Sequence, residues 1–243
     1  MRRFAWLWLL VGCSCAWGCD YVWDLRDAKF RDAGPPADQP FLHYTFDSIA
    51  DGMTPEANGG PPATCTSCPT LVDGSRAMAL SFDGTTQGLQ IESGAFTPLK
   101  GPFTIALWLR VTKLGINACP LSKPYGSDRD DSFQLCLNGG QYLSFITGTD
   151  EVDTPTLGNL VTLGFFHVAL TYDGSTKLVF INGHMSGMGG SDSFAPHYDA
   201  SAGLVGYDLD DGSTITAAYD GAVDDLQVYD HALTVEEIQS LAF

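Results

Sequence analysis

The chain of 243 residues has a net charge of −17, from 12 lysines and arginines against 29 aspartates and glutamates. A surface this acidic repels nucleic acid and anionic lipid headgroups, so we expect neither as a partner. Hydrophobic residues make up 44% of the chain and 27 glycines supply turns, which fits one all-β sandwich domain behind a leader.

The amino terminus has the features of an export signal. Two arginines precede an apolar run at residues 4–11, which is too short to span a bilayer. We therefore expect residues 1–19 to be a signal segment. Residues 20–40 are polar, lack a sustained period and end in a Gly-Pro-Pro-containing stretch, so we expect a disordered tether. The folded domain is predicted to cover residues 41–243.

The sequence Leu-Val-Gly-Cys at residues 10–13 resembles a bacterial lipobox, in which the cysteine is acylated. The resemblance implies lipidation of Cys13, with Cys19 as the alternative and an ordinary signal cleaved near Ala16 as a third interpretation. Several acyl chains give durable anchoring. The prediction is thus an exported bacterial cell-envelope protein, at the outer membrane or facing the periplasm, that touches the membrane only through its lipid.

Strand signals recur through the domain at the spacing of an all-β fold. The predicted early strands are residues 41–47, 77–82, 89–91, 103–111, 133–137 and 142–146. An Asp-Gly pair at 83–84 predicts a hairpin between 77–82 and 89–91. A Gly-Gly pair at 139–140 predicts a second hairpin between 133–137 and 142–146.

The clearest hairpin signal lies at residues 165–183. Hydrophobic residues occupy every second position in 166–172 and 178–180, on either side of Asp173-Gly174. Aspartate and glycine tolerate the positive φ of tight turns, so this stretch predicts a hairpin with one buried face. A second sheet must then cover that face.

The carboxyl-terminal part contains two late strands and the one credible helix. The strands are predicted at 203–206 and 219–229. The helix is predicted at 234–241, because Thr234 and Glu237 have the spacing of a capping box ahead of an apolar stripe.

Four cysteines remain beyond the leader: Cys65, Cys68, Cys119 and Cys136. An even number in an oxidising compartment indicates two disulfides, although three pairings are open. We favour Cys65–Cys68 as a clip within a loop and Cys119–Cys136 between neighbouring strands. The alternative is a zinc site, since Cys-x-x-Cys is half of a zinc motif.

In their order along the chain, these segments resemble the laminin G-like, concanavalin A-like jelly roll over about residues 41–241. The matching pieces are Tyr-Thr-Phe-Asp at 44–47, Ala-Leu-Ser-Phe-Asp-Gly at 79–84, Pro-Phe-Thr-Ile at 102–105 with Trp108, the hairpin at 165–183, residues 221–229, Ala-Leu-Thr at 232–234 and Glu237-Ile238. Phe165 stands where the family usually has tryptophan. The resemblance implies an all-β fold, a two-sheet antiparallel β-sandwich of the jelly-roll type with one short C-terminal helix.

This fold hosts lectins, adhesion modules and hydrolases, so the resemblance does not by itself fix a function. Laminarinase-type hydrolases of this architecture carry Glu-x-Asp-x-x-Glu on one strand. The nearest match, at residues 151–156, lacks the second glutamate and contains a proline. The sequence has no Gly-x-Ser-x-Gly motif and its histidines are scattered. We predict a protein that is not an enzyme.

The resemblance also implies a calcium site. Related jelly rolls often hold one calcium ion at a sheet edge, with an aspartate of the first strand and one of the penultimate strand. Those positions match Asp47 and Asp224, with Asp51 as a third candidate. The predicted cofactor is a structural Ca²⁺ ion, since calcium prefers oxygen ligands. The alternative is that Asp47 ends a strand and Asp224 binds backbone amides.

Sugar binding is the best-known activity of such domains. A sugar site usually combines an aromatic platform with polar groups. The domain's one tryptophan, Trp108, is expected to be buried in its strand. The candidate ligand-binding residues are therefore in loops: Tyr125, Asp128, His197, Tyr198 and Tyr207.

Two functions remain. The first is a cell-envelope lipoprotein whose non-catalytic, lectin-like domain binds a glycan. The alternative is a non-lectin adhesion or assembly module that binds a cell-surface protein. Exposed aromatic loops favour the glycan, and a broad sheet face without a hollow favours the protein partner.

Overall fold

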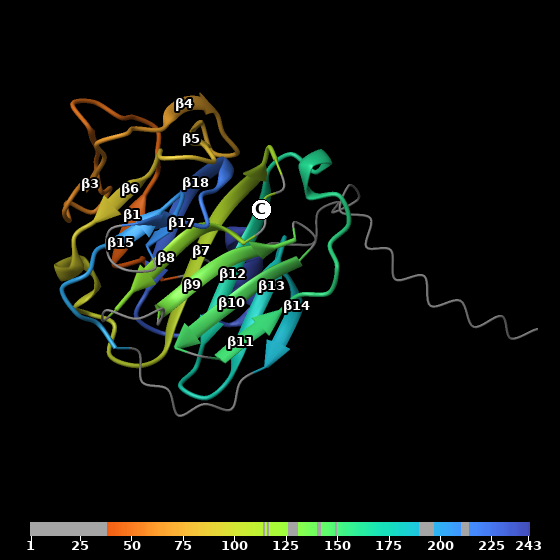
Figure 1. The fold of residues 1–243 in the computed structure, drawn as a ribbon. Coiled ribbons are helices and arrows are strands. Elements are labelled where there is room, and N and C mark those ends of the chain that lie inside the picture. Colours follow the sequence, from red (N-terminus) through yellow and green to blue (C-terminus); the bar gives the residue numbers. More distant parts are fainter. Residues whose placement is uncertain are drawn as a thin grey trace, which may run out of the picture.

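The computed structural model describes residues 38–113, 115, 117–125, 131–139, 142–148, 150–189, 197–209 and 214–243. The predicted signal segment, both lipidation candidates (Cys13 and Cys19) and nearly all of the predicted tether lie outside these residues. In the described part, two eight-stranded antiparallel sheets stack face to face (Figure 1). The predicted β-sandwich is confirmed. No helix among the described residues is long and apolar enough to cross a membrane.

Sheet A contains the predicted central hairpin and the longest strands. Its order is β14 (His184–Gly189), β13 (Lys177–Ile181), β12 (Phe166–Tyr172), β7 (Phe103–Val111), β18 (Asp220–Tyr229), β5 (Met78–Asp83) and β4 (Thr70–Asp73), and β1 (Leu42–Tyr44) pairs with β18.

Sheet B lies against sheet A. Its order is β11 (Asp150–Asp153), β10 (Tyr142–Gly148), β9 (Asp131–Asn138), β8 (Ala118–Pro124), β15 (Gly203–Val205), β6 (Leu89–Ile91), β3 (Ala63–Thr64) and β2 (Met53–Thr54). Two short 3₁₀ helices, η1 (Ser93–Phe96) and η2 (Leu160–Thr162), lie in connecting loops.

Aromatic rings join the two sheets. Phe103 of sheet A lies 5.9 Å from Phe133 and 6.1 Å from Phe145 of sheet B, measured between ring centroids. Tyr172 packs on Phe103 from the neighbouring strand at 5.8 Å. These buried rings belong to the core cluster that fills the space between the sheets. Because aromatic side chains bury large areas, they supply much of the contact that holds the sandwich together.

The hairpin at 165–183 is confirmed as β12 and β13. Its turn covers residues 173–176, where Asp173 Oδ1 accepts hydrogen bonds from the backbone amides of Ser175 and Thr176. The expected single buried face is wrong for both strands: all of β12 is buried, with Val168 in the core between the sheets and Ala169 on the opposite face. Val179 packs in the core between the sheets, whereas Phe180 packs on the opposite face.

That opposite face of sheet A is covered by helix α1 (Val235–Leu241). The predicted capping box is present: Glu237 N donates to Thr234 Oγ1, and Thr234 N donates to Glu237 Oε2. Ile238 of the helix is fully buried against Phe180 and Tyr229. The helix therefore removes the part of this face around Phe180 from solvent, whereas Trp108 and Arg110 of β7 stay partly exposed.

Of the other two predicted hairpins, one is correct and one is wrong. The hairpin of β9 and β10 is confirmed. The hairpin predicted at Asp83-Gly84 is wrong, because β5 belongs to sheet A and β6 to sheet B. Asp83 Oδ1 accepts hydrogen bonds from the backbone amides of residues 85–87, which shapes a wider loop. That loop carries the chain from one sheet to the other.

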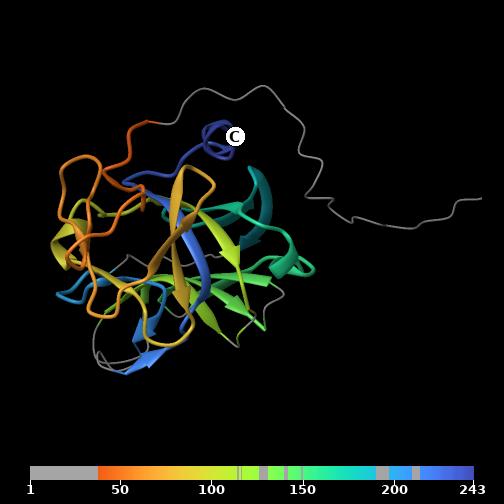
Figure 2. The same ribbon diagram turned by 90° about the horizontal axis from the view of Figure 1, so that it is seen from above.

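The outer face of sheet B is crossed by a small hairpin of β16 (Asp208–Leu209) and β17 (Ile215–Thr216). In Figure 2 this hairpin and helix α1 lie on opposite sides of the two sheets. Gly206 leads into the hairpin with a φ of +94°. Its amide donates to Pro120 O at 3.0 Å, and its carbonyl accepts from Tyr219 N at 2.9 Å. Gly206 thus attaches the start of the hairpin to Pro120 of β8, and joins it to Tyr219 at the hairpin's other end.

We expect Gly206→Ala to lower the free energy of unfolding by about 2–4 kcal/mol, because a Cβ is strained at positive φ and overlaps the ring of Phe82. Chemical denaturation measures the loss. Gly101→Ala is the matched control, since a Cβ there meets nothing within 4 Å. Equal stability of the two variants would show that Gly206 is not required.

Candidate functional site

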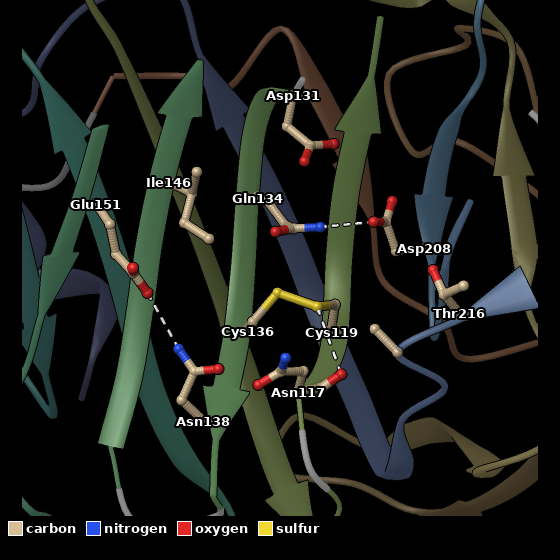
Figure 3. A pocket seen from close by; sticks show the side chains of 11 residues that line it. Asn117, Cys119, Asp131, Gln134, Cys136, Asn138, Ile146, Glu151, Asp208 and Thr216 are labelled. Atoms are coloured by element: carbon tan, nitrogen blue, oxygen red, sulfur yellow. Dashed lines mark hydrogen bonds between the residues drawn. A yellow bond between two sulfur atoms is a disulfide. The ribbon is translucent and has the colours of Figure 1, made fainter. Parts of the chain in front are cut away.

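The outer face of sheet B has a hollow of about 500 Å³ (Figure 3). Strands β8, β9 and β10 form its floor, β11 one side and the β16–β17 hairpin the other. Alternate residues of β9 point into it, because successive side chains of a strand leave the sheet on opposite faces. The lining residues are Asn117, Cys119, Asp131, Gln134, Cys136, Asn138, Ile146, Glu151, Asp208, Thr216 and Ala217.

Side-chain amides and carboxylates are paired on both sides of the hollow, as Figure 3 shows. Gln134 Nε2 donates to Asp208 Oδ2 at 2.8 Å, and Asn138 Nδ2 donates to Glu151 Oε1 at 3.0 Å. These bonds hold the planar groups in fixed orientations. Planar amides and carboxylates offer several donor and acceptor positions, which suits recognition of ligand hydroxyls.

A nonpolar strip separates the two polar pairs. It consists of the Cys119–Cys136 disulfide, which joins β8 to β9, and the side chain of Ile146 on β10. The Cys65–Cys68 disulfide is also present, in the loop before β4. The structure therefore has the two expected pairings, and these cysteines are not available as zinc ligands. The strip gives the hollow a surface against which a ligand's nonpolar face can rest.

The β16–β17 hairpin is fastened to β8. Cys119 N donates to Ala217 O at 2.7 Å, and Ser122 Oγ donates to Tyr207 O at 3.2 Å. Together with the bond between Gln134 and Asp208, these contacts place the hairpin firmly over the sheet. The wall of the hollow is therefore part of the rigid sandwich.

The predicted ligand-binding residues do not form one cluster. Tyr125 and His197 stack with ring centroids 5.4 Å apart, and Ser132 Oγ donates to His197 O beside the start of β9. Tyr198 instead packs against the core between the sheets. Tyr207 is 6% exposed and its hydroxyl accepts from Gln90 Nε2. Tyr207 is buried and Tyr198 is half-buried, and their role as ligand-binding residues stays a prediction. Asp128 lies outside the described residues.

None of the described residues that line the hollow is among the predicted ligand-binding residues, although Cys119 and Cys136 are predicted as a disulfide. A usable signal was present on β9, where Gln134, Cys136 and Asn138 alternate with core residues. Such alternation marks an outward face with polar character. The contribution of Asp208 had no comparable signal, because it depends on how the hairpin crosses the sheet.

Trp108 faces away from the core between the sheets and lies beneath Arg76, whose guanidinium carbon is 5.6 Å from the ring centroid. His167 is its cross-strand neighbour and is buried. Burial lowers the pKa of His167 to about 3, so the ring is neutral at physiological pH. Trp108 is therefore half-buried, where the sequence predicts a buried side chain.

Two of the three predicted calcium ligands, Asp47 and Asp224, accept hydrogen bonds from backbone amides of the same segment, residues 75–78. Asp224 Oδ2 accepts from the backbone amides of Ser75 and Arg76 at 2.7 and 2.8 Å, and Asp47 Oδ1 accepts from Met78 N at 2.9 Å. Burial, together with the charges of nearby Asp225 and Asp47, raises the pKa of Asp224 to about 6 although the two backbone amides oppose the shift.

The other oxygen of Asp224 is buried and has no hydrogen-bond partner among the described residues. A Cβ at Gly74 would lie 2.6 Å from Asp224 Oδ2, so the loop is shaped closely around this carboxylate. These features fit a bound cation with oxygen ligands. Asp51 does not complete the set: no group of three acidic, histidine or cysteine side chains is placed to hold a metal in the described part of the chain.

The stacked antiparallel sheets, with a polar hollow on one outer face, define a lectin-like jelly roll. The laminin G-type family model described as the concanavalin A-like lectin/glucanases superfamily matches residues 83–239, and the chain belongs to this family. A search of curated proteins finds no match.

Similar solved structures include domains that bind sugars. Domain 4 of the Geobacillus stearothermophilus arabinanase AbnA, in complex with arabinotriose, is 20% identical, with a TM-score of 0.63 over 84% of this chain and 98% of that one. A Ruminococcus gnavus sialidase CBM40 bound to α2,3-sialyllactose is 17% identical, with a TM-score of 0.57 over 68% of this chain and 96% of that domain. Trypanosoma rangeli sialidase is 15% identical, with a TM-score of 0.65 over 88% of this chain but 35% of the sialidase. These likenesses show the fold.

We expect Asp224→Asn to become progressively more stable than the wild type as pH rises from 4 to 7 in the presence of chelator. A carboxyl whose folded pKa is raised to about 6 stabilises the fold only while protonated, so the wild type loses that contribution through this range. The difference in the free energy of unfolding between Asp224→Asn and the wild type should grow by about 2–3 kcal/mol over this range, measured by denaturant unfolding at each pH. Glu92→Gln, at an exposed carboxylate that makes no side-chain cap hydrogen bond, is the control; a pH-independent difference at Asp224 would contradict the expectation.

Proposed function

We propose that the protein is a cell-envelope lipoprotein whose non-catalytic domain binds a glycan in the hollow on the outer face of sheet B. The observation that carries the proposal is the combination of fixed amide–carboxylate pairs with a nonpolar strip between them. A sugar ring presents hydroxyls at its edge and C–H groups on its faces, and the hollow offers partners for both.

The comparisons support a glycan as the ligand. The arabinanase domain and the CBM40 domain were each solved with an oligosaccharide. The hollow's volume of about 500 Å³ lies within the usual range for small-molecule sites. Its lining carries the carboxylates of Asp131, Glu151 and Asp208 and no lysine or arginine among the described lining residues. An uncharged glycan is therefore favoured over a sialylated one.

The arrangement of the carboxylates favours binding over hydrolysis. Glu151 and Asp208 each accept a hydrogen bond from a side-chain amide, so the pairs present these carboxylates as acceptors. A glycosidase needs one carboxyl that remains protonated to donate to the leaving group. Two carboxylates held as hydrogen-bond acceptors suit recognition of hydroxyls.

The lipid anchor rests on the amino-terminal sequence. The apolar run at 4–11 and Cys13 support acylation at that cysteine, and residues 20–40 would then separate the domain from the membrane. A sugar-binding domain held in this way would attach the cell envelope to a polysaccharide or to another surface.

We expect Asn138→Ala to weaken glycan binding about tenfold or more, because the change removes one amide and frees Glu151 from its fixed orientation. A glycan array that contains arabinan oligosaccharides and sialyllactose identifies the ligand, and titration calorimetry measures the affinity. Asn159→Ala is the matched control, since Asn159 is exposed on the η2 loop outside the hollow.

Wild-type affinity in both Asn138→Ala and Gln134→Ala would overturn the assignment of the hollow. Absence of any glycan binding by the folded wild type would overturn the lectin function itself. In that case a protein partner would become the leading alternative.

We also propose that a structural Ca²⁺ ion binds at Asp47 and Asp224. The cation would offset the cost of burying the ionised Asp224 carboxylate. We expect millimolar Ca²⁺ to raise the melting temperature of the wild type by several degrees at pH 7, and to leave that of Asp224→Asn unchanged. Differential scanning calorimetry with Ca²⁺ and with chelator makes the comparison; Mg²⁺ is the control. Equal shifts in both proteins would exclude this site.

A further inference from the structure

A second hollow lies on the other side of the β16–β17 hairpin. Its volume is about 310 Å³. The hairpin forms a wall common to both hollows: Asp208 and Thr216 line the first, whereas their neighbours Leu209 and Ile215 line the second. Cross-strand pairing of Asp208 with Thr216 and of Leu209 with Ile215 explains this division, because paired residues share a face.

The second hollow differs chemically from the first. None of its described lining residues is charged. Hydroxyl and amide groups come from Thr64, Thr66, Ser67, Thr86, Gln90 and Tyr207. Ser67 Oγ and Thr86 Oγ1 lie 3.2 Å apart, and Gln90 Nε2 donates to the Tyr207 hydroxyl at 3.1 Å. Beside these groups, Leu209 and Ile215 supply an aliphatic wall.

This lining suits one uncharged sugar unit. Hydroxyl and amide groups can both donate and accept, so they match the hydroxyls of a sugar in either role. Aliphatic side chains can cover the C–H face of the ring. The volume is at the lower end of the range for small-molecule sites, which fits a single unit better than a whole oligosaccharide.

The two hollows lie along the same sheet. The floor of the first is centred on β9, and the second lies over β6, three strand positions away in the order β9-β8-β15-β6. Strand spacing of about 4.8 Å puts these strands roughly 14 Å apart. A short oligosaccharide that runs across the strands would reach from one hollow to the other over the hairpin.

We propose that the second hollow is a separate subsite, and that the domain binds a linear, neutral oligosaccharide on both sides of the β16–β17 hairpin. The proposal rests on the glycan-binding function assigned to the first hollow and extends it. Because the hairpin is fastened to β8, both subsites are preorganised, and occupation of the second adds to the affinity of a chain already held in the first.

The test is a length series. Arabino-, cello- and malto-oligosaccharides of two to six units are titrated calorimetrically into the purified full-length protein. We expect the dissociation constant for the preferred series to fall at least about tenfold from the shortest to the longest chain. Thr86→Trp fills the second hollow and should abolish this dependence while leaving the affinity for the disaccharide within about twofold.

Thr85→Trp is the matched control, because Thr85 is an exposed neighbour that does not line the hollow. If Thr86→Trp retains the full dependence on length, the second subsite is overturned, and the first hollow stands as long as Asn138→Ala still weakens binding. If no series binds to the folded protein at any length, both the subsite and the binding of neutral linear chains are overturned.

Discussion

Successive side chains of a strand point to opposite faces of a sheet. A sandwich that buries one face of each sheet therefore leaves two outer faces, each of which must be covered by another element or carry side chains that tolerate water. The inner faces meet through aromatic contacts such as Phe103 with Phe133 and Phe145. Helix α1 covers part of the outer face of sheet A, where its Ile238 is buried on Phe180. The outer face of sheet B has no helix in the described part of the chain and keeps polar side chains instead. The difference between the two outer faces is the reason why the proposed binding hollows lie on sheet B.

The β16–β17 hairpin converts that open face into hollows. A flat sheet of polar side chains would offer little enclosure, and ligand sites are usually concave. The hairpin stands on β8 through backbone and side-chain hydrogen bonds, and it contributes Asp208 to one side and Leu209 to the other. Gly206 is necessary for this placement because the chain turns there with a positive φ against the ring of Phe82. A backbone constraint at one residue thus supports the geometry of the proposed binding face.

The sequence predicts the elements of this fold better than their assembly. Period-two patterns identified the hairpin of β12 and β13, and local capping residues identified helix α1, because both depend on neighbours in the chain. The Asp83-Gly84 turn was misassigned because the same residues serve a sheet-to-sheet crossing, which only the distant partners β18 and β3 distinguish. The sequence predicts Tyr198 and Tyr207 in loops, yet tertiary packing buries Tyr207 and half-buries Tyr198. Gln134 and Asp208 are 74 positions apart, so no local pattern pairs them.

Charge gives the two candidate sites different roles. On the open face of sheet B, carboxylates accept hydrogen bonds from amides, and their charge on a chain with a net charge of −17 suits neutral hydroxyl-bearing ligands and disfavours anionic sugars. At Asp224 the carboxylate is fully buried beside Asp47 and Asp225, and Asp225 already accepts from His43 Nε2 at 2.6 Å. A negative charge in that position is costly without a counter-charge, and the backbone amides of Ser75 and Arg76 offset only part of the cost. A cation there would stabilise the strand ends of sheet A on the side away from the hollows, so it would act on the scaffold and leave glycan contacts to sheet B.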